Sequence, residues 1–447
     1  MTQATALAEP SSLETWCAQA LDAARGAGAD AAEVAVSVSR GLSVRVRGGE
    51  IDTVEFQGDR GLSVTAFRGR RSASVTTTDL TATAIADAAG RAAALARHTG
   101  EDPWAGLADP GLMAAELPEL DLHHPWHPEV REAEALAREM EEAAFAADPR
   151  VTQVEPASVN TGESITAYAN SHGFFGYHRT SDHGLACAAV SRDADGAMQR
   201  DHHYSRACHA AGLAPAAEVG RLAGRRAAAR LGATTPATAR VPVLFPAELA
   251  RGLLRHFVGA ISGGALYRDA SFLKDRVGEA VFAEAVDIVQ RPHLRRALGS
   301  AAFDADGVAT RERELVAGGV LQGYLLGSYA ARRLGLETTG NAGGVFNLEI
   351  VPGDEDAAAL RRRAGTGLLV TELMGQGVSL ITGDYSRGAA GFWIEDGEIA
   401  RPVQNATIAG NLADIFRDIV AIGNDLDVRG SLRAPSLLIG EMTVGGQ

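Results

Sequence analysis

Short runs in which apolar and polar residues alternate fill much of the first hundred residues. Alternation with β-branched residues is typical of half-buried strands, and it recurs between residues 33 and 78 in EVAVSVS, LSVRVRG, IDTVEF, LSVTAFRG and SASVTTT. Alanine-rich helical patterns at 12–26 and 81–98 flank these runs. We therefore predict a first N-terminal unit over residues 1–120, with an antiparallel meander of strands between two helices.

The same order of elements recurs over residues 121–236, which we predict to be a second, middle unit. A charged amphipathic helix is expected at 128–148 and another helix at about 216–231, with several strand-like runs between them. Segments rich in proline, aspartate, histidine or threonine at 116–128 and 232–240 are the expected linkers.

From residue 237 onward the pattern changes to short apolar runs separated by glycines, for example VPVLF, GGVFNLEIV and VSLITG. This pattern predicts a large, mainly antiparallel β domain over 237–447 with a few helices packed on it. The helices are expected at ELARGLLRHFVGAI (248–261) and over 411–423, where apolar residues recur at the spacing of one buried helix face. The expected fold class is α+β.

Composition narrows the classes of function. The net charge of −14 disfavours direct binding of nucleic acid, and no run of 18 or more apolar residues predicts a membrane span. Residues 1–30 lack the basic and apolar regions of a signal peptide. The three scattered cysteines, Cys17, Cys187 and Cys208, suit a reduced compartment, so a cytoplasmic protein is expected.

Residues that could carry chemistry are few. Paired carboxylates at Asp304 and Asp306 and at Glu395 and Asp396 precede glycines, and we expect both pairs at hairpin tips. No GxSxG elbow is present. Three histidines lie beside Pro125 and Pro128 in the first linker, where we expect a solvated loop; they are His123, His124 and His127.

The segment Gly365–Asp425 resembles the TldD/PmbA metallopeptidase family, closest to its PmbA/TldE branch. Further segments that carry the resemblance are Gly252–Leu273, Tyr329–Gly344 and Ala31–Phe56. Together they extend over nearly the whole chain.

The catalytic branch of that family has an HExxxH motif after an apolar Gly-x-Leu-Leu run, and a cysteine ligand later in the chain. Matching Gly252–Leu254 to that run puts His256 at the first ligand, Phe257 at the glutamate and Ile261 at the second histidine. The late segment DVRGSLRAPS (427–436) has no thiol. Catalytic zinc needs three protein ligands, so the resemblance implies no catalytic residue and no metal ligand set in this chain, with zinc in a TldD-like partner.

The segment GDYSRGAAGFW (383–393) places four polar residues between glycines, which suits a tight turn beside a groove. An equally good interpretation is a corner that only closes the sheet. A peptide could add a strand to a sheet edge there. The candidate residues for a peptide channel or an interface are therefore His256, Asp384, Tyr385, Ser386 and Arg387.

The resemblance implies a non-catalytic TldE/PmbA-like subunit of a heterodimeric zinc metallopeptidase that processes unfolded peptides with a TldD-like partner. One alternative is an independently active metallopeptidase with a rearranged site. Another is a regulatory binding protein, because members of the family have also been described as proposed modulators of DNA gyrase.

Overall fold

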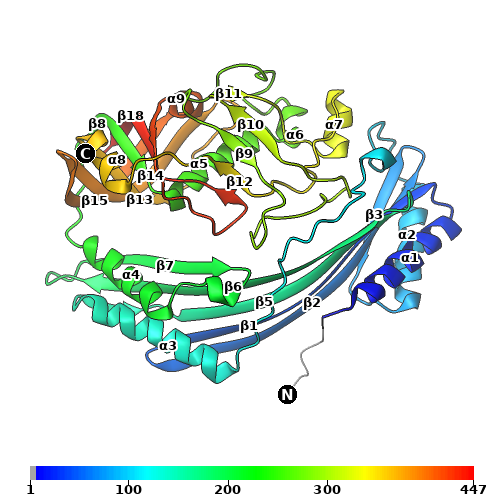
Figure 1. The fold of residues 1–447 in the computed structure, drawn as a ribbon, viewed down its shortest axis with the longest axis horizontal. Helices are drawn as coiled ribbons and strands as arrows, with labels where there is room; N and C mark the ends of the chain where they lie inside the picture. Colours follow the sequence, from blue (N-terminus) through cyan, green and yellow to red (C-terminus); the bar gives the residue numbers. More distant parts are fainter. Residues whose placement is uncertain (1–6, 447) are drawn as a thin grey trace.

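The chain forms two lobes, a long curved sheet with helices on its outer face and a second lobe that lies over the concave face (Figure 1). The computed structural model describes residues 7–446. None of the helices within this range is both long and apolar enough to cross a membrane.

The first lobe is one seven-stranded sheet, in the order β3-β2-β1-β5-β6-β4 with β7 paired to β6. It unites the two predicted helix–sheet–helix groups, because β1 pairs antiparallel with β5 over almost its full length. The strands are β1 (Ala31–Arg47), β2 (Glu50–Arg68), β3 (Arg71–Thr77), β4 (Val151–Val154), β5 (Ala157–Asn170), β6 (Phe175–Arg192) and β7 (Met198–Ala207). The helices are α1 (Pro10–Gly26), α2 (Ala82–Ala96), α3 (Val130–Ala147) and α4 (Ala216–Ala229).

Alternation along the strands decides which face the helices cover. In β1, Val34, Val36 and Val38 point into the core beneath α1 and α2. The intervening Ser37 and Ser39 belong to the concave face, which carries small polar side chains. Hydroxyl groups pair with each other across strands on that face, for example Ser164 with Thr180 at 2.9 Å. The concave wall thus carries paired hydroxyl groups, and charged side chains such as Glu55, Asp59 and Asp182 belong to the same face.

The second lobe is built on a closed ring of five strands, β15-β14-β13-β8-β18, in which β15 also pairs with β18. A further sheet has the order β11-β10-β9-β12-β17. The strands are β8 (Ala239–Phe245), β9 (Ile288–Gln290), β10 (Arg313–Ala317), β11 (Val320–Leu321), β12 (Leu348–Ile350), β13 (Gly367–Met374), β14 (Asp384–Glu395), β15 (Glu398–Asn411), β16 (Ile419–Ile422), β17 (Leu432–Arg433) and β18 (Leu437–Gly445). The helices are α5 (Ala247–Ala260), α6 (Gly263–Leu266), α7 (Ser328–Leu334), α8 (Ala357–Ala364) and α9 (Leu412–Arg417).

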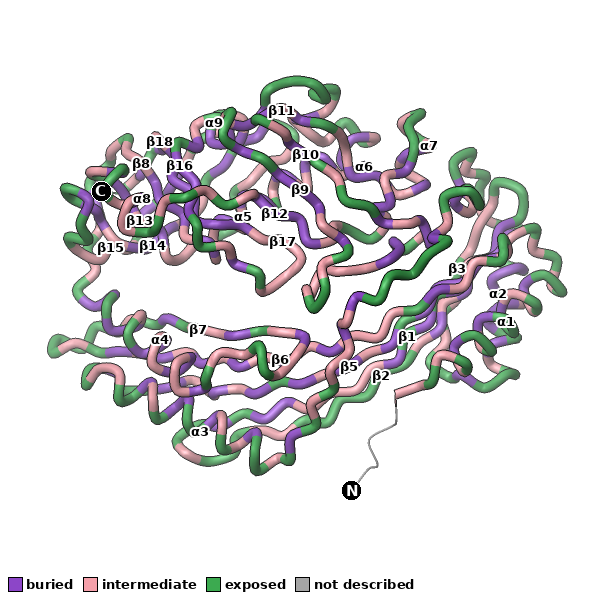
Figure 2. Tube along the Cα trace, in the orientation of Figure 1, coloured by how far each residue is buried: buried purple, intermediate pink, exposed green. Residues whose placement is uncertain are grey.

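The α+β class, with mainly antiparallel sheets, is confirmed, and Figure 2 shows the buried positions of both lobes. The predicted helix over 411–423 is wrong beyond its first turns. Asn411 caps α9, which ends at Arg417, and Ile419–Ile422 instead form β16 against β18. A short apolar run is compatible with the spacing of a helix and with that of a strand. Here the run forms a strand because it pairs with β18.

Candidate functional site

Helix α5 has one apolar face in the core of the second lobe and one polar face toward the first lobe. Leu253, Leu254 and Phe257 lie on the apolar face and are buried. The predicted helix at this position is confirmed.

The positions where a catalytic glutamate and a second histidine would stand are both fully buried among apolar side chains. Phe257 and Ile261 each have 0% exposure. The ring of Phe257 lies edge-on to Phe282 and Phe416, at centroid distances of 5.0 and 6.2 Å. A carboxylate or a metal ion at this place would lose its hydration without gaining a partner.

His256 and Tyr385, two of the candidate residues, are brought together. Their rings meet edge-on with 5.9 Å between centroids. Burial, and then the positive charges of Arg387 and Arg255, lower the pKa of His256. Burial raises the pKa of Tyr385 to about 12. At neutral pH the pair is therefore an uncharged imidazole beside a protonated phenol.

The other polar residues of this segment do not join the pair as a group. Arg387 shares the side of β14 with Tyr385 and donates from Nε to the carbonyl oxygen of Met374 at 3.2 Å. Asp384 and Ser386 alternate to the opposite side and are exposed.

Addition of a peptide strand along β14 is contradicted by the structure. β15 pairs with one side of β14 and β13 with the other. At Asp384–Arg387 the loop before the strand takes the place of β13, because Ser386 N–H donates to Gly377 O and Tyr385 forms a bridge with Val378. No edge is left for an added strand.

The residues of this chain do not fit a zinc site of the implied type. The segment 427–436 supplies Asp427, but that carboxylate is bonded to Arg429 and paired with Arg251. The three cysteines are buried in the first lobe. Across residues 7–446, no group of three or more His, Cys, Asp or Glu side chains has an arrangement that could hold a metal ion.

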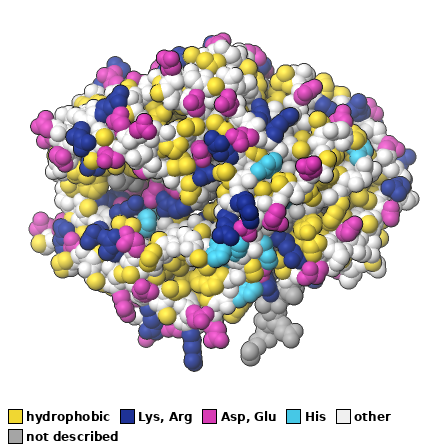
Figure 3. Space-filling model, in the orientation of Figure 1, with side chains coloured by type: hydrophobic (Ala, Val, Ile, Leu, Met, Phe, Trp, Pro, Cys, Tyr) yellow, Lys and Arg dark blue, Asp and Glu magenta, His cyan; other side chains and the backbone are white. Residues whose placement is uncertain are grey.

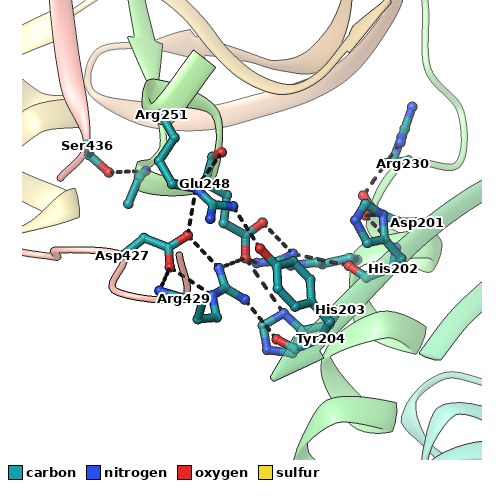
Figure 4. A network of polar contacts seen from close by, with 12 residues as sticks. Asp201, His202, His203, Tyr204, Arg230, Glu248, Arg251, Asp427, Arg429 and Ser436 are labelled. Carbon is teal, nitrogen blue, oxygen red and sulfur yellow. Dashed lines mark hydrogen bonds and ion pairs between the residues drawn. The ribbon is translucent and has the colours of Figure 1, made fainter. Parts of the chain in front are cut away.

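A network of ion pairs joins the polar face of α5 to the first lobe (Figure 4). Glu248 accepts hydrogen bonds from Arg226 of α4 at 3.1 Å and from Arg429 at 2.8 Å. Arg251 donates to the hydroxyl of Tyr204 on β7 at 2.7 Å, and Arg429 lies over the same ring at 4.2 Å. Sequence reasoning missed this network because its members come from four separate segments, namely β7, α4, α5 and the loop that contains Arg429.

Charge compensation keeps Glu248 ionised despite its burial. Burial raises the pKa of this carboxyl, but the hydrogen bonds and charges of Arg226 and Arg429 outweigh it and lower the pKa to about 2. His203 lies beside the pair; burial, and then the charge of Arg226, lower the pKa of its imidazole to about 4. At neutral pH Glu248 is therefore ionised and His203 is uncharged.

A cleft of about 980 Å³ opens next to this network, between the two lobes. Its apolar wall includes Phe392 and Ile399 of β14 and β15, and its charged wall includes Arg225 and Arg226 of α4. Figure 3 shows a hollow between the lobes with basic and acidic side chains at its mouth. His256 is not among the residues that line the cleft.

The prediction of a solvated loop for the three linker histidines is only partly right, because His127 is exposed but His123 and His124 are half-buried. The Nε2 atoms of His123 and His127 lie 2.7 and 2.8 Å from the carboxylate of Glu163, on the helix-covered face of the sheet. Arg40 donates to the same carboxylate at 2.5 Å. Burial raises the pKa of Glu163, but these three contacts together lower it to about 2.

One of the two predicted hairpin tips is buried. Glu395 and Asp396 do form the exposed turn between β14 and β15. Asp304, in contrast, is 2% exposed, and its carboxylate accepts bonds from the N–H groups of Asp306, Val308 and Ala342. Burial, and then the charge of Asp306, raise its pKa to about 7.

This hairpin packs onto the first lobe, which explains its burial. Phe303 stacks on His178 of β6 with 4.2 Å between ring centroids. Gly307 has a φ of 78° and lies against Tyr168 and Phe174, where a side chain would clash. The turn therefore forms a second contact between the lobes.

Three family profiles match consecutive parts of the chain. They are the PmbA/TldA metallopeptidase domain 1 at residues 32–96, the central domain at 123–231 and the C-terminal domain at 238–446.

Whole-length relatives agree with these profiles. Metalloprotease PmbA of Escherichia coli O157:H7 is 43% identical over 435 residues, which cover 97% of this chain and 96% of the relative. A crystal structure from Bacteroides thetaiotaomicron, of a proposed modulator of DNA gyrase, superposes with a TM-score of 0.92 at 26% identity and covers 97% and 99% of the two chains. TldE of Thermococcus kodakarensis shares the fold, with a TM-score of 0.83 at 18% identity and coverage of 97% and 100%.

Proposed function

The chain belongs to the PmbA/TldD metallopeptidase family, and we propose that it is the non-catalytic, TldE-like subunit of a heterodimeric metallopeptidase. In this proposal a TldD-like partner supplies the zinc and the catalytic glutamate. The complex acts in the cytoplasm on unfolded peptides.

The burial of Phe257 and Ile261 carries this proposal. A change of two side chains would not restore a metal site, because both positions are enclosed by apolar residues and have 0% exposure. His256 alone is one ligand, and catalytic zinc uses three. This burial supports a subunit that shares the metallopeptidase fold and leaves the metal to its partner.

The surfaces that remain suit a structural role toward a peptide. The concave sheet face carries small hydroxyl side chains such as Ser164 and Thr180, which can bond a main chain without selecting its sequence. The cleft adds the apolar side chains Phe392 and Ile399 along one wall. In this account His256, Tyr385 and Arg387 belong to the interface with the partner or to the peptide channel.

Co-expression with a TldD-like protein tests the proposal. We expect a complex of one chain of each kind on size-exclusion chromatography, with peptidase activity on an unfolded substrate such as casein. The proposal fails if the two chains elute separately and the TldD-like protein is equally active alone.

The description of the Bacteroides relative favours a second candidate, a regulatory protein that acts on DNA gyrase. Because the chain has a net charge of −14, it would be repelled by DNA, so such a regulator would contact the gyrase protein itself. A pull-down that recovers gyrase and no TldD-like chain would support this candidate over the first.

A further inference from the structure

The two edges of the seven-stranded sheet differ in whether their outward main-chain groups have hydrogen-bond partners. On the β7 edge, three outward carbonyl groups each accept a hydrogen bond from an arginine, at 3.0, 3.2 and 2.8 Å. The pairs are Arg200 with Arg230, His202 with Arg226, and Tyr204 with Arg429. These guanidinium groups stand where the N–H groups of a neighbouring strand would stand, so no strand can be added there.

The opposite edge is open along the first half of β2. β3 pairs only with Leu62–Arg68, which leaves Glu50–Arg60 without a neighbour on that side. Nine of these eleven residues are exposed, and Thr53 and Val54 are half-buried. Long exposed edges of this kind are rare in soluble proteins, which normally cover, charge or shorten them.

The register shows which main-chain groups point outward. A two-residue turn closes the β2–β3 hairpin at Arg68 and Arg71, so even-numbered residues of β2 direct their N–H and C=O groups to the β3 side. The β1–β2 register is unshifted from Phe67 back to Thr53, so the alternation continues. Val54, Phe56 and Gly58 therefore present these groups at the open edge, where no residue of 7–446 bonds them.

A groove lies beside this edge on the helix-covered face. The side chain of Phe56 is 68% exposed there. Next to it is a cavity of about 430 Å³ whose lining includes Trp126, Pro125 and Pro128 of the first linker. A strand added along β2 would direct every second side chain toward this groove.

The edge is held in place before any partner arrives. Both oxygens of the buried Glu141 on α3 accept main-chain N–H bonds at 2.6 Å, one from Gly48 and one from Gly49, at the tip of the β1–β2 hairpin. A rigid edge loses little conformational freedom on binding.

Charge selects the partner strand. The open segment contains four carboxylates and one arginine; they are Glu50, Asp52, Glu55, Asp59 and Arg60. Glu55 and Asp59 alternate with Phe56 and so face the concave side. Opposite charges across strands stabilise pairing and like charges oppose it, so a second copy of this edge is disfavoured.

We propose that the open edge of β2 binds an extended segment of another protein, in which apolar residues alternate with lysine or arginine. The apolar side chains enter the groove beside Phe56, and the basic ones meet Glu55 and Asp59. This surface is separate from the cleft, and the proposal does not rest on the division of labour with a TldD-like subunit.

Binding of a labelled peptide of alternating valine and lysine, about eight residues long, to the full chain tests the proposal by fluorescence anisotropy. Gly58→Pro removes an outward N–H that β1 does not use, whereas Gly58→Ala keeps it, and open space surrounds the added methyl group. We expect affinity to fall at least about tenfold in Gly58→Pro and to change less than about twofold in Gly58→Ala. Glu55→Lys should lower the affinity for the lysine–valine peptide and raise the affinity for a peptide of alternating glutamate and valine.

Hydrogen exchange separates strand addition from attraction by charge alone. Binding of the peptide should slow exchange of the Phe56 amide. The proposal is overturned if Gly58→Pro binds as tightly as the unaltered chain, if the glutamate–valine peptide binds the unaltered chain equally well, or if the Phe56 amide stays unprotected. It is also overturned if the chain alone forms a dimer that Gly58→Pro dissociates, because a second copy would then occupy the edge.

Discussion

The ring of His256 lies edge-on against the ring of Tyr385, with 5.9 Å between their centroids. The one histidine that matches a zinc ligand of the catalytic branch thus contacts a buried phenol, and the next residue, Phe257, is enclosed in the core. His256 thus takes part in the packing between α5 and β14.

Replacing Phe257 with glutamate should destabilise the protein severely. A carboxylate at a site with 0% exposure and only apolar neighbours has no partner, and we expect a loss of more than about 3 kcal/mol in the free energy of unfolding. Chemical denaturation measures this loss. Arg255→Glu, on the polar face of the same helix, is the control and should cost less than about 1 kcal/mol. Similar stability of the two variants would show that the core can accept the catalytic glutamate.

Stability should fall at acidic pH because of Glu248. The carboxyl has a pKa of about 2 in the folded protein and an ordinary value of 4.5, so its stabilisation is complete above pH 4.5 and is lost as the pH falls toward 2. The total contribution is at most about 3 kcal/mol. Urea denaturation at pH 5 and at pH 3 should show this loss in the unaltered chain and a smaller loss in Glu248→Gln. An unchanged pH dependence in the variant would contradict the assignment.

Asp304 should act in the opposite direction. Its pKa of about 7 in the folded protein lies above its ordinary value of 3.8. The stabilisation is therefore complete below pH 3.8 and is lost as the pH rises through 7, by at most about 4 kcal/mol. We expect the free energy of unfolding to decline between pH 4 and pH 8, and to decline less in Asp304→Asn. If the slope is the same in both proteins, Asp304 does not titrate near neutrality.

Glu163 should be required to hold the first linker on the sheet. Its carboxylate is the shared partner of Arg40, His123 and His127. Glu163→Ala leaves the Arg40 guanidinium without its partner and should lower the free energy of unfolding by about 3 kcal/mol. Limited proteolysis should then cut the linker within 116–128 faster than in the unaltered chain. Glu142→Ala, at an exposed position of α3 away from the linker, is the control, and equal cleavage rates in the two variants would contradict the role of Glu163.

Local spacing predicted most of the elements, because helices and strands follow from near neighbours in sequence. Helix α5 and the alternating strands of the first lobe are examples. The prediction of a helix over 411–423 was wrong for its second half, because Ile419–Ile422 pair with β18, which is distant in sequence.

Distant contacts also explain what the sequence could not reveal about the candidate site. The prolines beside the linker histidines indicated a loop. The partner of these histidines, Glu163, is on β5 and is bonded to Arg40 on β1, and both strands are distant from the linker in sequence. The network around Glu248 likewise joins α4, α5 and the loop at Asp427–Arg429. Nothing in any one segment indicates its partners.

Zinc content and peptidase activity, measured on this chain alone, on a TldD-like chain alone and on their mixture, test the central claim most directly. The account predicts that the isolated chain holds no stoichiometric zinc and cleaves no unfolded peptide, and that the mixture is active with zinc in the TldD-like chain. Stoichiometric zinc in this chain, together with cleavage by this chain alone, would contradict the account.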